Sequence, residues 1–137
     1  MNPVLTPELA AKRRAFVEET AAHYNSKNRS MNTKNGACMY SPAHAGTEGC
    51  AIGRKVADKN LCRTFDEQYC NSAVSATSVF TQLPPELQEL GVDFLDEVQL
   101  LHDETYYWCE GGLNASGREV LGAIISRHCA VDEGGTK

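Results

Sequence analysis

The sequence is short of the local patterns that usually indicate catalysis or metal binding. It contains no Gly-x-Ser-x-Gly nucleophile motif, no Gly-x-x-x-x-Gly-Lys phosphate loop and no His-Glu-x-x-His metal pair, so the local signatures of serine hydrolases, P-loop enzymes and zinc proteases are missing. Its six cysteines include no Cys-x-x-Cys pair, the spacing typical of structural zinc. We therefore expect reduced thiols that fill the core, and neither a metal nor a cofactor.

Long apolar runs are missing as well. No stretch stays apolar over the roughly 20 residues that a helix needs to cross a bilayer, and the N-terminal segment lacks the apolar centre of a signal peptide. The sequence therefore predicts a cytoplasmic protein that does not engage a membrane.

A hydrophobic fraction of 42% and a charged fraction of 23% are ordinary for a globular chain. They favour a single domain over residues 1–137, with a flexible tail at 132–137.

Charge is unevenly distributed along the chain. Residues 27–63 hold seven basic and two acidic side chains, whereas residues 64–137 hold three basic and thirteen acidic ones. The acidic C-terminal half argues against a nucleic-acid polymer as partner, because such binding requires a continuous basic face. The basic segment is compatible with a small anionic ligand, or with neutralisation by the acidic half within the fold or across a subunit interface.

Helical patterns cover most of the chain. Thr6 followed by Pro7 and Glu8 is typical of a helix start, and the apolar residues that follow have helical spacing. Residues 71–82 show no clear period and stay unassigned. The expected helices span about 7–26, 65–71 after a capping box at Thr64, 84 to a terminating Gly91, Asp93 to about 107, and a last helix from Asn114 or Ser116.

One small β element is expected among these helices. Residues 37–40 and 50–52 are short strand-compatible runs on either side of a loop rich in proline, glycine and small side chains. They predict a β-hairpin within an element of about 37–54, whose second strand ends at Gly53 and Arg54. The predicted fold class is therefore α+β, a mostly helical single domain with one small hairpin.

The residues expected to bind a ligand come from the basic segment and from the end of the helix that begins at Asp93. Arg54 offers a planar set of donors to a phosphate, Gly53 allows close backbone approach and Lys55 adds charge. Aromatic rings can stack on a base, and a histidine or carboxylate can bond its polar groups. The alternative for Arg54 is one of the protein's own carboxylates. The predicted ligand-binding residues are Tyr40, Gly53, Arg54, Lys55, His102, Asp103 and Trp108.

The order of several short patterns resembles small uncharacterised proteins encoded by phages and prophages. The patterns are Tyr40, Gly-Cys-Ala-Ile-Gly-Arg from Gly49 to Arg54, Leu83-Pro84, Phe94-Leu95, Gln99-Leu-Leu-His-Asp103 and Trp108. The resemblance spans about residues 38–121 and brings no assigned activity or site. A phage origin implies a role against host defence, and one class of such proteins consists of oligomeric sponges that sequester nucleotide immune signals.

The sequence is therefore compatible with three functions. The first is a homo-oligomeric protein of the host cytosol that sequesters a small anionic, nucleotide-like ligand without cleaving it. The second is a protein-binding inhibitor or adaptor that docks on a host or phage protein through its acidic half. The third is a metal-dependent phosphohydrolase built on His102 and Asp103, with His23 or His44 and Asp132 completing the ligands. The first hypothesis is preferred, with binding in place of catalysis.

Overall fold

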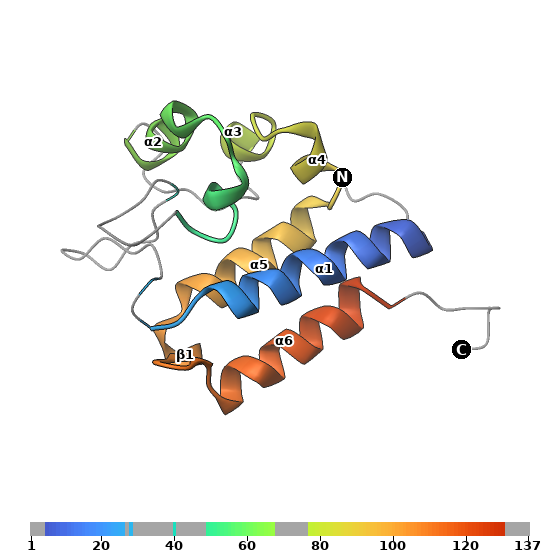
Figure 1. The fold of residues 1–137 in the computed structure, drawn as a ribbon. Coiled ribbons are helices and arrows are strands. Elements are labelled where there is room, and N and C mark those ends of the chain that lie inside the picture. Colours follow the sequence, from blue (N-terminus) through green and yellow to red (C-terminus); the bar gives the residue numbers. More distant parts are fainter. Residues whose placement is uncertain (1–4, 27, 29–39, 41–48, 68–76, 131–137) are drawn as a thin grey trace.

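Three long helices form the main body of the protein, whose computed structural model describes residues 5–26, 28, 40, 49–67 and 77–130. Helices α1 (Pro7–His23), α5 (Val92–Asp103) and α6 (Ala115–His128) each contact the other two (Figure 1). Within the described residues no helix is long and apolar enough to cross a bilayer.

Shorter elements complete the fold. Above α1 and α5 in Figure 1 lie η1 (Gly53–Lys55), α2 (Lys59–Glu67), α3 (Thr77–Phe80) and α4 (Pro85–Gln88). Between α5 and α6 the chain forms η2 (Thr105–Tyr107) and an antiparallel hairpin of β1 (Trp108–Cys109) and β2 (Gly112–Leu113), with Trp108 opposite Leu113. The predicted class, α+β and mostly helical with one small hairpin, is confirmed.

The core lies between the three long helices and extends to the short ones. Phe16 of α1 meets Phe94 of α5 edge to face, with ring centroids 6.1 Å apart. Val17, Leu95, Val98 and Leu101 are fully buried. Since these residues repeat at helical spacing in the sequence, each helix turns one apolar stripe toward the others.

Arg13 joins the three long helices at one end, although it is a charged residue in a buried position. Its Nε donates to the carbonyl of Leu90, 2.8 Å away, just before α5, and its Nη1 donates to the carbonyl of His128 at the end of α6, 3.0 Å away. The guanidinium also lies over the Phe94 ring, 5.4 Å from its centroid. Burial lowers the pKa of Arg13, with a smaller opposing effect from Cys129.

The first and last helices begin where the sequence predicts. The Thr6 hydroxyl accepts a bond from the Leu9 amide at 3.1 Å, and the Asn114 side chain accepts one from the Gly117 amide at 2.9 Å. The first helix ends at His23, earlier than the predicted 26. It stops there because the Asn28 side chain donates to the His23 carbonyl at 2.8 Å and takes the place of the next helical turn.

The hairpin lies at Trp108–Leu113 and not in the predicted element at 37–54. Residues 50–52 form a turn that leads into η1 and are not a strand. Cys50, Ala51 and Ile52 are all fully buried, whereas a strand with one solvent face alternates between buried and exposed positions. Of the predicted first strand only Tyr40 belongs to the described residues.

Helix α2 begins earlier than predicted, because Asp58 and not Thr64 provides its cap. The Asp58 carboxylate accepts from the amides of Asn60 at 3.0 Å and Leu61 at 3.3 Å. Thr64 lies inside the helix, where its hydroxyl donates to the Asn60 carbonyl. The predicted end of this helix, at 68–71, lies outside the described residues.

The region from residue 77 to 107 follows the prediction in outline. Helix α3 falls in the unassigned segment. Helix α4 begins at Pro85, one residue after the predicted start, and ends at Gln88, before the predicted end at Gly91. Gly91 has φ 95° and ψ 139° and precedes the first residue of α5, so it opens that helix and is not a left-handed terminator. Helix α5 ends at Asp103, and the chain then tightens into η2, whereas the prediction continued the helix to 107. The predicted flexible tail at 132–137 lies outside the described residues.

Candidate functional site

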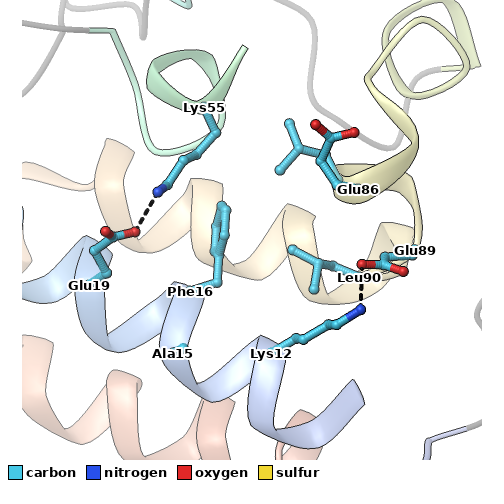
Figure 2. Close-up of a pocket in the computed structure, with 9 residues that line it drawn as sticks. Lys12, Ala15, Phe16, Glu19, Lys55, Glu86, Glu89 and Leu90 are labelled. Carbon is cyan, nitrogen blue, oxygen red and sulfur yellow. Dashed lines mark hydrogen bonds and ion pairs between the residues drawn. The ribbon is translucent and has the colours of Figure 1, made fainter. Parts of the chain in front are cut away.

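A pocket of about 540 Å³ opens between α1, η1 and α4. Figure 2 shows its lining, with the α1 side chains on one side and those of α4 and the following turn on the other. The lining residues are Lys12, Ala15, Phe16, Glu19, Lys55, Glu86, Leu87, Glu89 and Leu90. A volume of this order is that of a small-molecule site.

The pocket has an apolar floor and a charged rim. Phe16, Leu87 and Leu90 are nearly buried, with 8%, 3% and 4% of their surface exposed. Two ion pairs cross the rim on opposite sides of Phe16 (Figure 2): Lys55 Nζ is 2.6 Å from Glu19 Oε1, and Lys12 Nζ is 3.0 Å from Glu89 Oε2. The third carboxylate of the lining belongs to Glu86.

Arg54 is not one of the lining residues, but it bonds the same glutamate as Lys55. Its Nη2 is 3.4 Å from Glu19 Oε1 and 3.4 Å from the Thr20 hydroxyl. The guanidinium lies over the Tyr24 ring, 5.8 Å from the centroid, and the Arg54 side chain is only 8% exposed. Its buried Nε has no hydrogen-bond partner. The sequence left open whether Arg54 binds a phosphate or one of the protein's own carboxylates. In the structure its partner is a carboxylate, that of Glu19.

Glu19 is therefore shared between two cations. The hydrogen bond from Lys55 lowers the pKa of the Glu19 carboxyl; slight burial opposes this effect, and the charges of Lys55 and Arg54 add to it. The Glu19 side chain is 54% exposed. It is ionised and partly hydrated at neutral pH, so solvent weakens both of its ion pairs.

Tyr40 and Gly53 contact each other and do not line the pocket between α1, η1 and α4. Tyr40 is fully buried, its amide donates to the Asp66 carboxylate at 2.7 Å, and its ring packs edge to face on Phe65. A Cβ on Gly53 would lie 2.0 Å from the Tyr40 carbonyl oxygen. The close backbone approach that Gly53 allows is therefore to Tyr40, and the Tyr40 ring offers no surface to a base.

His102, Asp103 and Trp108 gather beside Tyr24. His102 is fully buried; its Nδ1 lies 2.8 Å from Asp103 Oδ1, and its ring meets Tyr24 edge to face at 4.7 Å. Trp108 also packs on Tyr24, and its Nε1 donates to the Leu101 carbonyl at 2.8 Å. The Tyr24 hydroxyl in turn donates to the carbonyl of Gly49 at 2.6 Å. These residues form a buried polar and aromatic cluster that joins α1 to the end of α5.

Only Lys55 of the predicted ligand-binding residues lines the pocket. The α1 residues of the lining were missed, although Lys12, Phe16 and Glu19 follow the spacing that places side chains on one helical face. Charged residues at such spacing are common on solvated helices, so the pattern alone does not distinguish a pocket wall from an ordinary surface. This face of α1 becomes a pocket wall only because α4, which is far away in the sequence, lies opposite it.

Metal and thiol chemistry find little support in the described part of the chain. Among those residues no three histidines, cysteines or carboxylates lie together in a way that could hold a metal ion. His44 and Asp132, two of the proposed phosphohydrolase ligands, lie outside the described residues. Cys62 is fully buried, and burial raises the pKa of its thiol to about 11, against a smaller opposing effect of Lys59. Such a thiol is a poor nucleophile at neutral pH.

No protein-family model, no curated protein and no solved structure matches the chain.

Proposed function

We propose that the protein acts by binding, and that a small ligand with an anionic and an aromatic part, of nucleotide type, occupies the pocket between α1, η1 and α4. The observation that carries the proposal is the lining itself: Lys12 and Lys55 lie on opposite sides of the apolar floor around Phe16 (Figure 2). An apolar floor receives the flat face of a base, and an ammonium group receives a phosphate.

The charges of the pocket set the strength of this binding. Each lysine is paired with a glutamate, and the lining holds three carboxylates against two lysines. A phosphate must therefore compete with Glu19 or Glu89 for its lysine. Because these pairs are exposed to solvent, displacing a glutamate from its lysine costs little free energy. Since salt screens exposed charges, we expect binding to weaken steeply as salt is added.

The resemblance to phage proteins supplies the biological part of the proposal. A pocket that binds a nucleotide signal, in a protein without a nucleophile motif, suits sequestration better than turnover. The protein would then act in the cytosol of the infected host, as a homo-oligomer, and lower the concentration of a defence signal. Its mass under native conditions is expected to be a multiple of the 15.0 kDa chain.

The first experiment identifies the ligand and the lysine that binds it. Small molecules released from the purified protein are identified by mass spectrometry, and nucleoside mono-, di- and triphosphates are titrated by calorimetry. Lys55→Gln should weaken nucleotide binding about tenfold or more, as expected for losing a charge-assisted phosphate contact.

Arg14→Gln is the matched control, because Arg14 lies on the same helix as Lys12 and forms an exposed pair with Glu18 outside the pocket. It should leave affinity unchanged. The proposal is wrong if the wild-type protein binds none of these nucleotides, or if Lys55→Gln binds them as well as the wild type does.

The outer face of α5 favours a second function, that of an adaptor for another protein. Leu100 is 54% exposed, and Asp96 and Asp103 lie four residues before it and three after it, on the same helical face. An exposed leucine among carboxylates suits a partner segment that carries a leucine or valine between lysines or arginines.

This second function predicts binding of a basic amphipathic peptide in place of a nucleotide. Leu100→Ser should abolish that binding, whereas Tyr106→Ser, which removes another exposed apolar side chain but lies outside α5, should preserve it. The affinity of each variant for the peptide is measured by fluorescence anisotropy. Equal affinity of both variants and the wild-type protein would exclude Leu100 as a docking residue.

A further inference from the structure

The most unusual feature of the pocket rim is a pair of neighbouring cations that converge on a single carboxylate oxygen. Lys55 Nζ and Arg54 Nη2 both reach Glu19 Oε1, at 2.6 Å and 3.4 Å. The two cations differ in exposure: the Arg54 side chain is 8% exposed, the Lys55 side chain 34%. One donor is therefore buried by its surroundings, while the other is open to solvent and to a ligand.

The bonding of Arg54 is incomplete. Its contacts to Glu19 and Thr20 are both 3.4 Å, at the long end for a hydrogen bond, and its buried Nε has no partner. A buried cation with an unsatisfied donor is costly, because desolvation has removed the water that would otherwise bond it. Glu19 thus neutralises the guanidinium only in part.

Glu19 itself is the least restrained member of the group. More than half of its side chain is exposed, at 54%, and it enters the pocket from the last turns of α1, next to Lys55 in Figure 2. Rotating such a side chain into water costs little free energy for the partly exposed pair with Lys55. The buried Arg54, in contrast, would be left without a carboxylate. The Glu19 carboxylate is therefore in a position to leave when another anion takes its place.

We propose that Arg54 and Lys55 form an anion subsite that Glu19 occupies in the unliganded protein, and that a phosphate group of the ligand displaces the Glu19 carboxylate. This rests on the proposed function, because it assigns the phosphate end of the ligand to one end of the pocket. The arginine then takes the role expected from the sequence, through a subsite closed by the protein's own side chain. A phosphate carries more charge and more acceptor oxygens than a carboxylate, so it satisfies both donors at once.

The test uses inorganic phosphate as probe and Glu19→Gln as the variant. Removing the resident charge should raise phosphate affinity about tenfold or more, as expected for deleting a like charge at contact distance in a partly exposed site. Glu18→Gln is the matched control: Glu18 is the preceding residue, is 50% exposed and pairs with Arg14. It should leave phosphate affinity unchanged. Affinities are measured by calorimetry at low salt, with unfolding followed on the same samples.

A further variant shows which residues receive the phosphate. Adding Lys55→Gln to Glu19→Gln should remove the gain, and Lys55 is exposed enough for this variant to fold. Substitution of buried Arg54 is a weaker test, because the variant can fail to fold. The inference is overturned if Glu19→Gln gains no phosphate affinity, or gains it equally with and without Lys55. Nucleotide binding by the wild-type protein, and its loss in Lys55→Gln, is measured separately, so the proposed function can stand when the displacement of Glu19 fails.

Discussion

At the scale of single residues, the residues that look most unusual in the sequence make contacts in the protein interior. Gly53, Arg54 and His102 each meet a buried tyrosine: Gly53 the carbonyl of Tyr40, and the other two the ring of Tyr24. A glycine, an arginine and a histidine at such positions are also typical of binding sites, because close approach and charge are useful in both places. The sequence therefore identifies unusual positions correctly but does not say what they contact.

The close approach at Gly53 predicts a large loss of stability on substitution. In Gly53→Ala the added Cβ would lie 2.0 Å from a backbone oxygen that has little freedom to shift, so we expect a loss of more than about 2 kcal/mol. Gly122→Ala is the control, because nothing lies within 4 Å of a Cβ on this exposed helical glycine. It should stabilise the protein by about 0.5 to 1 kcal/mol. Urea unfolding measures both, and similar values for the two variants would contradict the packing described at Gly53.

At the scale of elements, side-chain caps set the helix boundaries, and the sequence predicted where the first and last helices begin. Thr6 caps the first helix as expected, and of the two candidates for the last helix, Asn114 and Ser116, the structure has Asn114 as the cap. For α2 the capping-box pattern at Thr64 favoured the wrong residue, because Asp58 provides the cap. The choice depends on Cys62 and Phe65, which are fully buried and must lie on the inner face of a helix that has already begun.

The cap of α2 predicts a contrast between two substitutions. Asp58→Ala removes the acceptor of the Asn60 and Leu61 amides and should cost about 1 kcal/mol. Thr64→Ala replaces a helix-interior residue with a better helix former and should change stability by less than about 0.5 kcal/mol. Thermal unfolding followed by circular dichroism compares them, and the reverse order would restore Thr64 as the cap.

At the scale of the whole molecule, charge is neutralised between helices that are distant in sequence. Arg54 and Lys55 of the basic segment pair with Glu19 of the first helix. The acidic half provides Glu97 of α5, which pairs with Arg127 and His128 of α6, the latter through a 2.7 Å contact between Nε2 and Oε2. These pairs connect α5 to α6 and α1 to η1. The uneven charge distribution therefore contributes to the packing of the helices, in addition to any role in ligand binding.

The Glu97 cluster predicts a contribution to stability that depends on pH. Burial acts to raise the pKa of the Glu97 carboxyl, but hydrogen bonds from Arg127 and His128 outweigh it and hold the pKa below its usual value of 4.5. The stabilisation is therefore present above about pH 4.5 and is lost as pH falls further through the lowered pKa. Glu97→Gln should reduce stability at pH 6 by less than about 1 kcal/mol, typical of a partly exposed pair.

The same substitution should flatten the acid limb of the stability profile. Urea unfolding from pH 3 to pH 7 measures the difference between the wild-type protein and Glu97→Gln, with Glu119→Gln, an exposed residue of α6, as the control. A difference that stays constant across this range would show that Glu97 does not titrate with a lowered pKa.

The sequence by itself determined the fold class, the first and last helices and the apolar stripe that each long helix buries, because capping and helical periodicity are local properties. Only the tertiary structure decided that the hairpin lies at Trp108–Leu113, that Tyr40 and His102 are core residues, and that Lys12, Phe16 and Glu19 form the wall of a pocket with α4. Whether a helical face is solvated, packed or hollow depends on which distant segment covers it. Arg54 shows the difference: its charge is evident in the sequence, but its partner, Glu19, is 35 residues away and was brought to it by the fold.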